Sequence, residues 1–300
     1  MNLLKKEALV TQVLKGIGQI MLQENSLTGL LFLIGIFLGS WQMGVGGLLA
    51  TLAGTLVARF LKYPAEEINQ GLYGFSAALV GVALTFMFQS QVIIWVLVVL
   101  GGGLATVVQH FFIRKNIPVF TLPFIIITWV VVFLLHRFTD IPPSDVLSAD
   151  IKIDDLDDFA TSINGFGEVI FQGGFWSGVL FFAAVFISNP AAALYGLFAS
   201  LLGAALSHHY GESMEQIHMG LFGFNVVLSA IVFAGFKKID GFWVLVAILL
   251  TWFIDIVLVE SNALDIFGGV LTFPFVAGTW VTLIIKKYLD PVLSKITFDF

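Results

Sequence analysis

The chain has 300 residues, of which 58% are hydrophobic and 11% are charged, and its formal net charge is −6. Soluble domains devote about a quarter of their residues to charge, so this composition excludes a soluble enzyme and predicts a membrane protein with many spans. The acidic balance disfavours nucleic acid as a partner, and the lack of cysteine excludes disulfides and thiolate metal sites.

The first half begins with a segment, residues 8–22, that is too polar to cross a bilayer. Five apolar spans are predicted after it, several of them short and therefore tilted or joined across weak breaks. They lie near residues 27–40, 44–60, 74–88, 91–112 and 118–137. Residues 65–73 are also too polar or too short to cross, so we expect both polar segments to be re-entrant or interfacial.

An acidic connector, residues 141–164, separates a first repeat half, 1–140, from a second half, 165–300, within one membrane domain. The second half predicts five further spans, which are also apolar and in part short. They lie near residues 176–188, 191–207, 223–236, 241–259 and 271–286, with re-entrant candidates near 157–171 and 213–222.

The two halves repeat one another in sequence. GQIMLQENSLTGLLF (18–32) aligns with GEVIFQGGFWSGVLF (167–181), and QGLYGFSAAL (70–79) aligns with MGLFGFNVVL (219–228), both at an offset of 149. TLPFIIITWV (121–130) aligns with TFPFVAGTWV (272–281) at an offset of 151. Because shared apolar composition would not keep Gly, Thr, Pro and Trp in register, the chain is predicted to be a duplication.

Five spans per half is an odd number, so the two halves must lie upside down relative to each other in the bilayer. With both termini in the cytoplasm, twelve of the fourteen Lys and Arg fall on the cytoplasmic side, and only Arg137 and Lys152 fall outside. The predicted fold is therefore an all-α integral membrane protein. It has about ten transmembrane helices plus re-entrant segments, arranged as two inverted five-helix repeats that enclose a pore. Equivalent residues of the halves would meet near the bilayer midplane.

Gln19 and Glu168 occupy equivalent positions just before the first predicted span of each half. A glutamate side chain within the bilayer is energetically costly unless it faces a cavity or a partner. The pair could supply acceptor oxygens for N–H donors along a pore, and ordinary helix capping at the interface explains it equally well. Phe75 and Phe224 are a second pair, each beside glycines that permit a helix break. Two facing rings would form a flat slot for a planar solute, with small-residue helix packing as the alternative.

Thr121 and Thr272 form a third pair, each two residues before a proline. Proline leaves main-chain acceptors free, and the threonine hydroxyl could bond a solute or bond back to its own helix. Asp255 is the one acid well inside a predicted span; we expect a structural bond to a neighbouring helix, with a proton relay as the alternative. Acceptor oxygens and aromatic faces together favour a small, neutral, planar solute rich in N–H donors.

These residues resemble the bacterial-type urea transporter family, also called urea channels. IPVFTLPF (117–124) fits the family signature of an apolar residue followed by Pro-x-x-Thr-x-Pro-Phe, and GGVLTFPF (268–275) carries it with Gly269 in place of the first proline. The blocks at 18–31 and the two Gly-Phe segments are also similar. The resemblance implies passive, channel-like passage of urea down its gradient through homotrimers in the cell inner or plasma membrane, one pore per protomer and no cofactor.

The resemblance also implies roles for matching positions. Gln19 and Glu168 would flank ladders of carbonyl oxygens that receive the N–H groups of urea, and Thr121 and Thr272 would form the middle constriction. One urea slot would be lined by Ile20, Leu22 and Phe75 and the other by Val169, Phe171 and Phe224, with Leu122 and Phe273 in the pore beside the threonines.

Three other functions are alternatives to a urea channel. A channel for another small neutral solute or for ammonium is the nearest, but ammonium recognition would be expected to use an aromatic cage and paired pore histidines. The adjacent His208 and His209 lie near a predicted span end and do not fit such a pair. A proton-driven transporter would need a titrating relay. The sequence contains neither His-Glu-x-x-His nor Gly-x-Ser-x-Gly, so we predict no enzyme.

Overall fold

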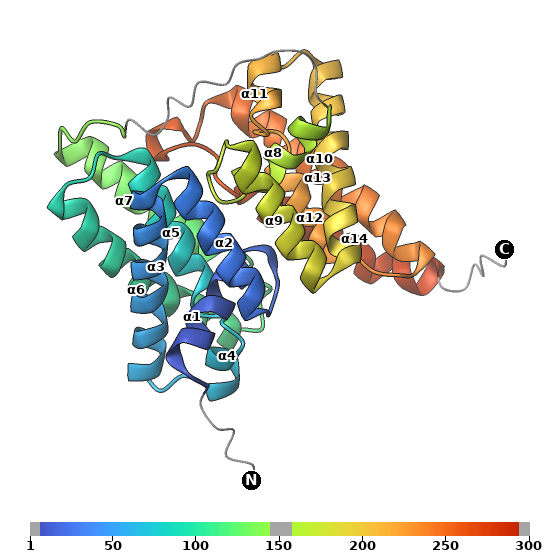
Figure 1. Cartoon of the computed structure of the whole chain (residues 1–300). Helices are drawn as coiled ribbons and strands as arrows, with labels where there is room; N and C mark the ends of the chain where they lie inside the picture. The colour runs from blue at the N-terminus through green and yellow to red at the C-terminus, as the bar shows by residue number, and fades with distance from the viewer. Residues whose placement is uncertain (1–6, 145–157, 294–300) are drawn as a thin grey trace, which may run out of the picture.

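The computed structural model describes residues 7–144 and 158–293, so the middle of the predicted connector lies outside the described residues. The regular elements in these ranges are helices, accompanied by one isolated bridge between Phe88 and Pro143. The helices of the first half group on the left of Figure 1 and those of the second half on the right.

A helix occupies every predicted span, and short helices occupy the predicted re-entrant segments. The first half contains α1 (Leu9–Gly18), η1 (Gln19–Met21), α2 (Ser26–Gly39), α3 (Trp41–Phe60), α4 (Ala65–Asn69), α5 (Phe75–Met87), α6 (Val92–Arg114) and α7 (Leu122–Phe138). The second half contains α8 (Asp158–Glu168), α9 (Phe175–Ser188), α10 (Pro190–Tyr210), α11 (Met214–His218), α12 (Phe224–Phe233), α13 (Lys238–Ser261), η3 (Asp265–Phe267) and α14 (Phe273–Leu293).

Four of the described helices are long and apolar enough to cross a membrane by themselves: α3, α6, α10 and α13. The segments Leu9–Met21 and Ser26–Gly39 pass the same test together but bend by 76° at their break. Several apolar helices of this length establish a membrane protein. Helices α5, α7, α9 and α12 are shorter and apolar, so the count of ten spans remains a prediction.

Local chemistry explains where the predicted spans break. Between α1 and α2 the backbone of Leu22 is left-handed, and the Asn25 side chain then caps α2 by accepting from the N–H groups of Leu27 and Thr28. Helix α7 begins four residues later than the predicted span because Phe120 has a φ of 46°. The turn at Leu22 therefore separates α1 and η1 from α2, and the turn at Phe120 sets where α7 begins.

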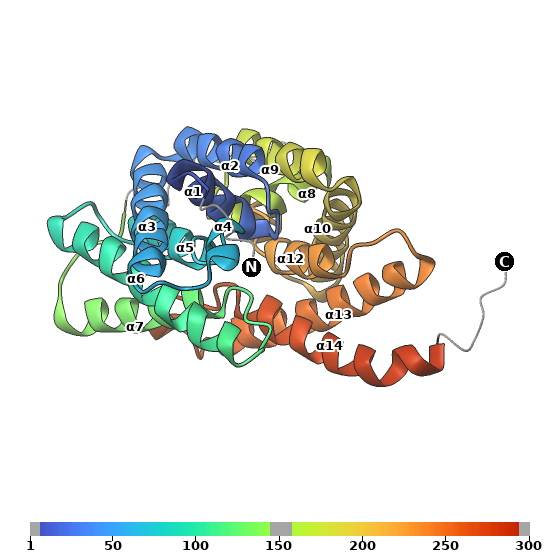
Figure 2. The same cartoon turned by 90° about the horizontal axis from the view of Figure 1, so that it is seen from below.

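Helices α2 and α9 pack side by side along one edge of the molecule, while α7 and α14 lie toward the opposite edge (Figure 2). Across the α2–α9 contact, Thr28 Oγ1 donates to the Ala184 carbonyl at 3.0 Å, and Ser177 Oγ donates to the Gly35 carbonyl at 2.9 Å. Thr28 matches Ser177 and Gly35 matches Ala184 at the repeat offset of 149. The same interaction is therefore made twice, once in each direction.

The loops before α7 and α14 show the same reciprocity. Trp129 Nε1 donates to the Gly269 carbonyl at 2.9 Å, and Trp280 Nε1 donates to the Pro118 carbonyl at 2.6 Å. Trp129 matches Trp280 and Pro118 matches Gly269 at the offset of 151. Each half therefore holds the loop of the other half in place through an indole N–H.

Replacing Thr28 by valine should lower the free energy of unfolding by about 0.6 kcal/mol, the average for a side-chain hydrogen bond between membrane helices. Valine keeps the shape of threonine but cannot donate to the Ala184 carbonyl. Thermal unfolding in detergent measures the change. Thr139→Val is the matched control, because the Thr139 hydroxyl bonds within its own segment to Leu135. Equal losses for the two variants would contradict a specific role for the α2–α9 bond.

Candidate functional site

Two cavities are lined by the predicted site residues, the first mostly by the first half of the chain and the second mostly by the second half. The first has a volume of about 430 Å³ and the second about 320 Å³. The first is lined by Gln19, Ile20, Leu22, Leu72, Phe75, Gln109, Ile113, Asn116, Ile117, Pro118, Val119, Phe120, Thr121 and Phe275. The second is lined by Phe86, Met87, Glu168, Val169, Phe171, Gln216, Leu221, Phe222, Phe224, Asp255, Val259, Asn262, Asp265, Gly268, Gly269, Val270, Leu271 and Thr272.

The two linings are largely built from matching positions of the repeat. At the offset of 149, the first cavity supplies Gln19, Ile20, Leu22, Leu72 and Phe75 where the second supplies Glu168, Val169, Phe171, Leu221 and Phe224. At the offset of 151, residues 117–121 of the first cavity match 268–272 of the second. The predicted slot residues thus all line one cavity or the other, whereas Leu122 and Phe273 line neither of the two.

Matching turns present these residues to the cavities. Leu22 and Phe171 have left-handed φ angles of 59° and 58°, which direct the chain out of the helix that precedes each of them. One residue later, Gln23 Nε2 donates to the Met21 carbonyl at 2.8 Å and Gln172 Nε2 donates to the Ile170 carbonyl at 3.1 Å. Two buried glutamines thus stabilise the same turn in both halves.

Phe75 and Phe224 each begin a helix after a glycine turn. Gly71 has a φ of 79°, and a Cβ there would lie 2.5 Å from the backbone N of Gly16; Gly220 has a φ of 85°. Only glycine fits such a close backbone approach at positive φ. The expectation that the two rings face each other across one slot is wrong, because Phe75 lines the first cavity and Phe224 the second.

Gln19 and Glu168 face equivalent cavities but differ in their bonding. Gln19 Nε2 donates to the Gln70 carbonyl at 3.0 Å, which leaves its Oε1 as the acceptor. Glu168 has no donor when ionised, and its carboxylate has no hydrogen bond or ion pair with any residue that the structure describes. Both side chains can therefore offer oxygen acceptors at the cavity wall.

Thr121 and Thr272 connect the two halves directly. Their hydroxyl oxygens lie 2.7 Å apart, and each residue is only 2% exposed. Thr121 lines the first cavity and Thr272 the second, so the pair lies where the two cavities approach each other. The alternative in which each hydroxyl bonds back to its own helix is wrong for this pair, since the two hydroxyls bond each other.

Further polar residues line the cavities from α6 and α13 or from the turns directly after them, and the repeated motifs did not place them in the site. Gln109 and Asn116 line the first cavity, and Asp255 and Asn262 line the second. These residues match at an offset of 146, and an alignment of Asn116 with Asn262 would have found them. A shift of three residues from the offset of 149 hid the relation, because long apolar helices contain few distinctive residues to mark the register.

Asp255 makes the predicted bond to a neighbouring helix and also faces the second cavity. Its Oδ2 accepts from Asn225 Nδ2 on α12 at 3.3 Å. In the first half, Gln109 Oε1 accepts from the Ser76 hydroxyl on α5 at 3.3 Å, with Ser76 at the position that matches Asn225. One acceptor on the long helix and one donor on the short helix thus recur beside each cavity.

A profile of the urea transporter family matches residues 10–287. The chain belongs to the urea transporter family. The resemblance noted from the sequence is therefore confirmed, and so is the exclusion of an enzyme, because the family consists of transporters.

Individual urea transporters are similar at low identity. The chain is 26% identical to urea transporter 1 of Mus musculus over 257 residues, which cover 78% of this chain and 66% of the relative. It is 27% identical to urea transporter 1 of Ovis aries over 241 residues, covering 75% and 63%. The chain thus spans about two thirds of the length of these urea transporters.

Proposed function

We propose that the protein is a passive, channel-like conduit that passes urea across the cell inner or plasma membrane down its gradient. The observation that carries this proposal is the arrangement of the two matching cavities on either side of the buried Thr121–Thr272 hydroxyl pair. Membership of the urea transporter family supports urea as the solute, as do the relatives named urea transporter 1.

The chemistry of the linings fits a planar solute with four N–H bonds. Removing water from unpaired polar groups costs several kcal/mol, so urea needs replacement acceptors along its path. Gln19 would offer an acceptor in the first cavity and Glu168 in the second, while Phe75, Phe171 and Phe224 cover the flat faces. Sites of this kind bind favourably enough for entry and weakly enough for release.

The threonine pair would act as the middle constriction. Each hydroxyl can both donate and accept, so a passing urea could accept a hydrogen bond from one hydroxyl at its carbonyl and donate an N–H to the oxygen of the other. The bond between the two threonines would open as the solute replaces it. Passage would then exchange one set of hydrogen bonds for another, without a charged intermediate.

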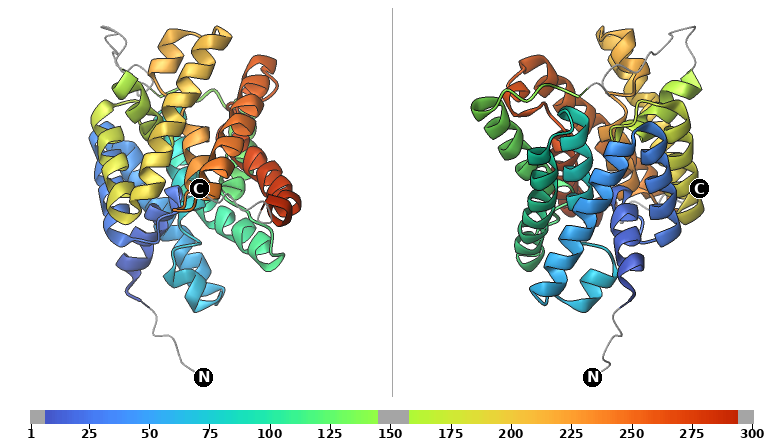
Figure 3. Two further views of the ribbon diagram at one scale, coloured as in Figure 1. Left: turned by 90° about the vertical axis from the view of Figure 1, so that its right-hand side faces the viewer. Right: turned by 60° about the vertical axis from the view of Figure 1, so that its left-hand side comes forward.

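An inverted repeat with about ten spans is part of the same proposal. Reciprocal contacts between the halves support it. In a two-fold arrangement, a bond from residue i of one half to residue j of the other is repeated with the roles of the halves exchanged. The matching helices α4 and α11 also lie at opposite ends of the molecule, at the bottom and top of Figure 1 and of both panels of Figure 3. We place both termini in the cytoplasm, in accordance with the positive-inside rule.

We also propose a homotrimer embedded in the lipid bilayer, with one pore in each protomer. Exposed large apolar side chains along α6, α10 and α13 suit contact with lipid or with another subunit. Native mass spectrometry of the protein in detergent tests the trimer, and a monomer or dimer would contradict it. Because both cavities lie within one chain, the urea conduit does not depend on the result.

Urea flux into proteoliposomes, followed by stopped-flow light scattering, tests the function. Wild-type protein should raise urea flux well above that of empty liposomes. Glu168→Ala should reduce the flux about fivefold because an acceptor for the N–H groups of urea is lost. A tenfold change in rate corresponds to a barrier change of about 1.4 kcal/mol. Glu66→Ala is the matched control, since Glu66 is exposed on α4 and lines neither cavity.

Parallel measurements with acetamide, glycerol and ammonium separate the proposal from its alternative, a channel for another small neutral solute or for ammonium. Urea should pass fastest. Flux of urea equal to that of empty liposomes would contradict the function, and unchanged urea flux through Glu168→Ala would contradict the role of this residue.

A further inference from the structure

The two cavities are built largely from matching positions of the repeat but differ in their acidic side chains. Where the first cavity has the amides of Gln19 and Gln109, the second has the carboxylates of Glu168 and Asp255. Asp265 adds a third carboxylate to the second cavity, and neither lining contains Lys, Arg or His. A neutral solute does not require this difference, because an amide oxygen accepts N–H groups as a carboxylate does.

Within the described part of the chain, Asp255 has a carboxyl oxygen without a partner at the wall of the second cavity. The residue is 1% exposed, and although its Oδ2 accepts from Asn225, its Oδ1 has no hydrogen-bond partner among the described residues. Buried charges are normally paired, because an unpaired one costs several kcal/mol. A cationic ligand in the second cavity would therefore favour the ionised form of both Asp255 and Glu168.

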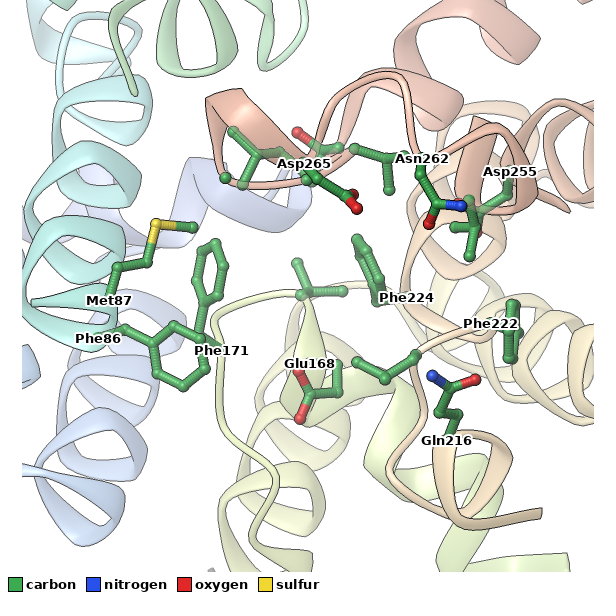
Figure 4. A pocket seen from close by; sticks show the side chains of 18 residues that line it. Phe86, Met87, Glu168, Phe171, Gln216, Phe222, Phe224, Asp255, Asn262 and Asp265 are labelled. Carbon is green, nitrogen blue, oxygen red and sulfur yellow. The ribbon is translucent and has the colours of Figure 1, made fainter. Parts of the chain in front are cut away.

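The geometry of the cavity selects the kind of cation. In Figure 4, Glu168 projects from one wall and Asp255 and Asp265 from the opposite wall, with the rings of Phe171 and Phe224 between them. The described residues contain no group of three or more His, Cys, Asp or Glu placed to hold a metal ion. Aromatic faces attract organic cations, and carboxylates pair most strongly with planar N–H donors. Both features favour a flat organic cation over a metal.

We propose that the second cavity is a binding site for a small planar organic cation of the guanidinium class. The carboxylates of Glu168 and Asp255 accept its N–H groups, and Phe171 and Phe224 cover its faces. Guanidinium has the shape of urea with the carbonyl oxygen replaced by a third amino group and a positive charge. Its effect on transport rests on the proposed function. Guanidinium would occupy the second urea slot and would find no carboxylate in the first cavity. It would therefore block urea flux competitively.

Binding of radiolabelled guanidinium to the purified protein in detergent tests the site without relying on transport. The wild-type protein should bind it saturably. Glu168→Gln places the residue of the first half in the second cavity and should weaken binding about tenfold, because charge-assisted hydrogen bonds are about twice as strong as neutral ones. Asp255→Asn should act likewise, and Glu66→Gln, which changes an exposed acid outside both cavities, should not. Thermal unfolding checks that each variant is folded.

The second readout is urea flux in proteoliposomes. The flux in low millimolar guanidinium chloride is compared with the flux in sodium chloride at equal ionic strength. Guanidinium should inhibit, and more urea should relieve the inhibition. Wild-type protein that conducts urea but neither binds guanidinium nor is inhibited by it would overturn this inference alone. Binding that depends on Glu168 in a protein that conducts no urea would support the site and contradict the proposed function. Equal binding by wild type and both cavity variants would overturn the site.

Discussion

Replacing Thr121 by valine should slow urea flux tenfold or more and should also destabilise the protein. Valine preserves the shape of threonine but leaves the hydroxyl of Thr272, which is 2% exposed, without its partner at 2.7 Å. An unsatisfied buried hydroxyl costs about 1–3 kcal/mol. A urea molecule between the cavities would lose the same hydroxyl, and a barrier higher by about 1.4 kcal/mol slows passage tenfold.

The double variant Thr121→Val with Thr272→Val separates stability from transport. Replacing both partners by apolar groups of the same shape is nearly neutral for stability, so the double variant should unfold at a higher temperature than either single variant. Its urea flux should remain low, because neither hydroxyl is left to meet the solute.

Thermal unfolding and stopped-flow urea flux measure the two effects. Thr282→Val is the control on α14, the helix that begins directly after Thr272, because its hydroxyl bonds to the Gly278 carbonyl of α14 itself. Additive losses of stability in the double variant would show that the two hydroxyls do not depend on each other. Wild-type flux in the double variant would place the urea path elsewhere.

Replacing Gly29 by alanine should destabilise the protein strongly. A Cβ at Gly29 would lie 1.8 Å from the carbonyl oxygen of Leu14, so α1 and α2 pack backbone against backbone. Overpacking in a core commonly costs about 1–3 kcal/mol and occasionally more. We expect the upper end or beyond, because the added methyl meets main chain, which cannot rotate away as a side chain can.

The yield of monodisperse protein in detergent and its thermal unfolding measure this effect. Gly103→Ala on α6 is the matched control, since its Cβ would meet only Val57 Cγ2, at 3.3 Å. Gly178→Ala repeats the test in the second half, where the Cβ would lie 2.5 Å from the Ile163 carbonyl oxygen. Folded Gly29→Ala protein with wild-type stability would contradict the close packing of α1 on α2.

The positions of the helices were largely predictable because helix formation depends on nearby residues. Long apolar runs predicted α3, α6, α10 and α13, and polar interruptions predicted the breaks around α1, α4, α8 and α11. Helix ends were less predictable where a single residue with positive φ decides them, as Phe120 does before α7. Leucine and phenylalanine at such positions give no local signal of a turn, unlike glycine or asparagine.

The candidate site was predictable only where the repeat keeps its register. Matching blocks pointed to Gln19 with Glu168 and to Thr121 with Thr272, and these residues do line the two cavities. Gln109 and Asp255 could not be paired in the same way, because apolar helices α6 and α13 diverge in sequence and shift to another offset.

Composition and repeated motifs can be read along the chain in order, so they were enough to predict a membrane protein of the urea transporter family built from two repeated halves. The packing of the helices was needed to find that Phe75 and Phe224 line different cavities and that Thr121 meets Thr272. It was also needed to find that Asp255 faces the second cavity with one oxygen unpaired among the described residues. These contacts join residues that are far apart along the chain. The two threonines are 151 residues apart, and which side chains meet over such a separation depends on how the helices of the two halves pack, which no local pattern records.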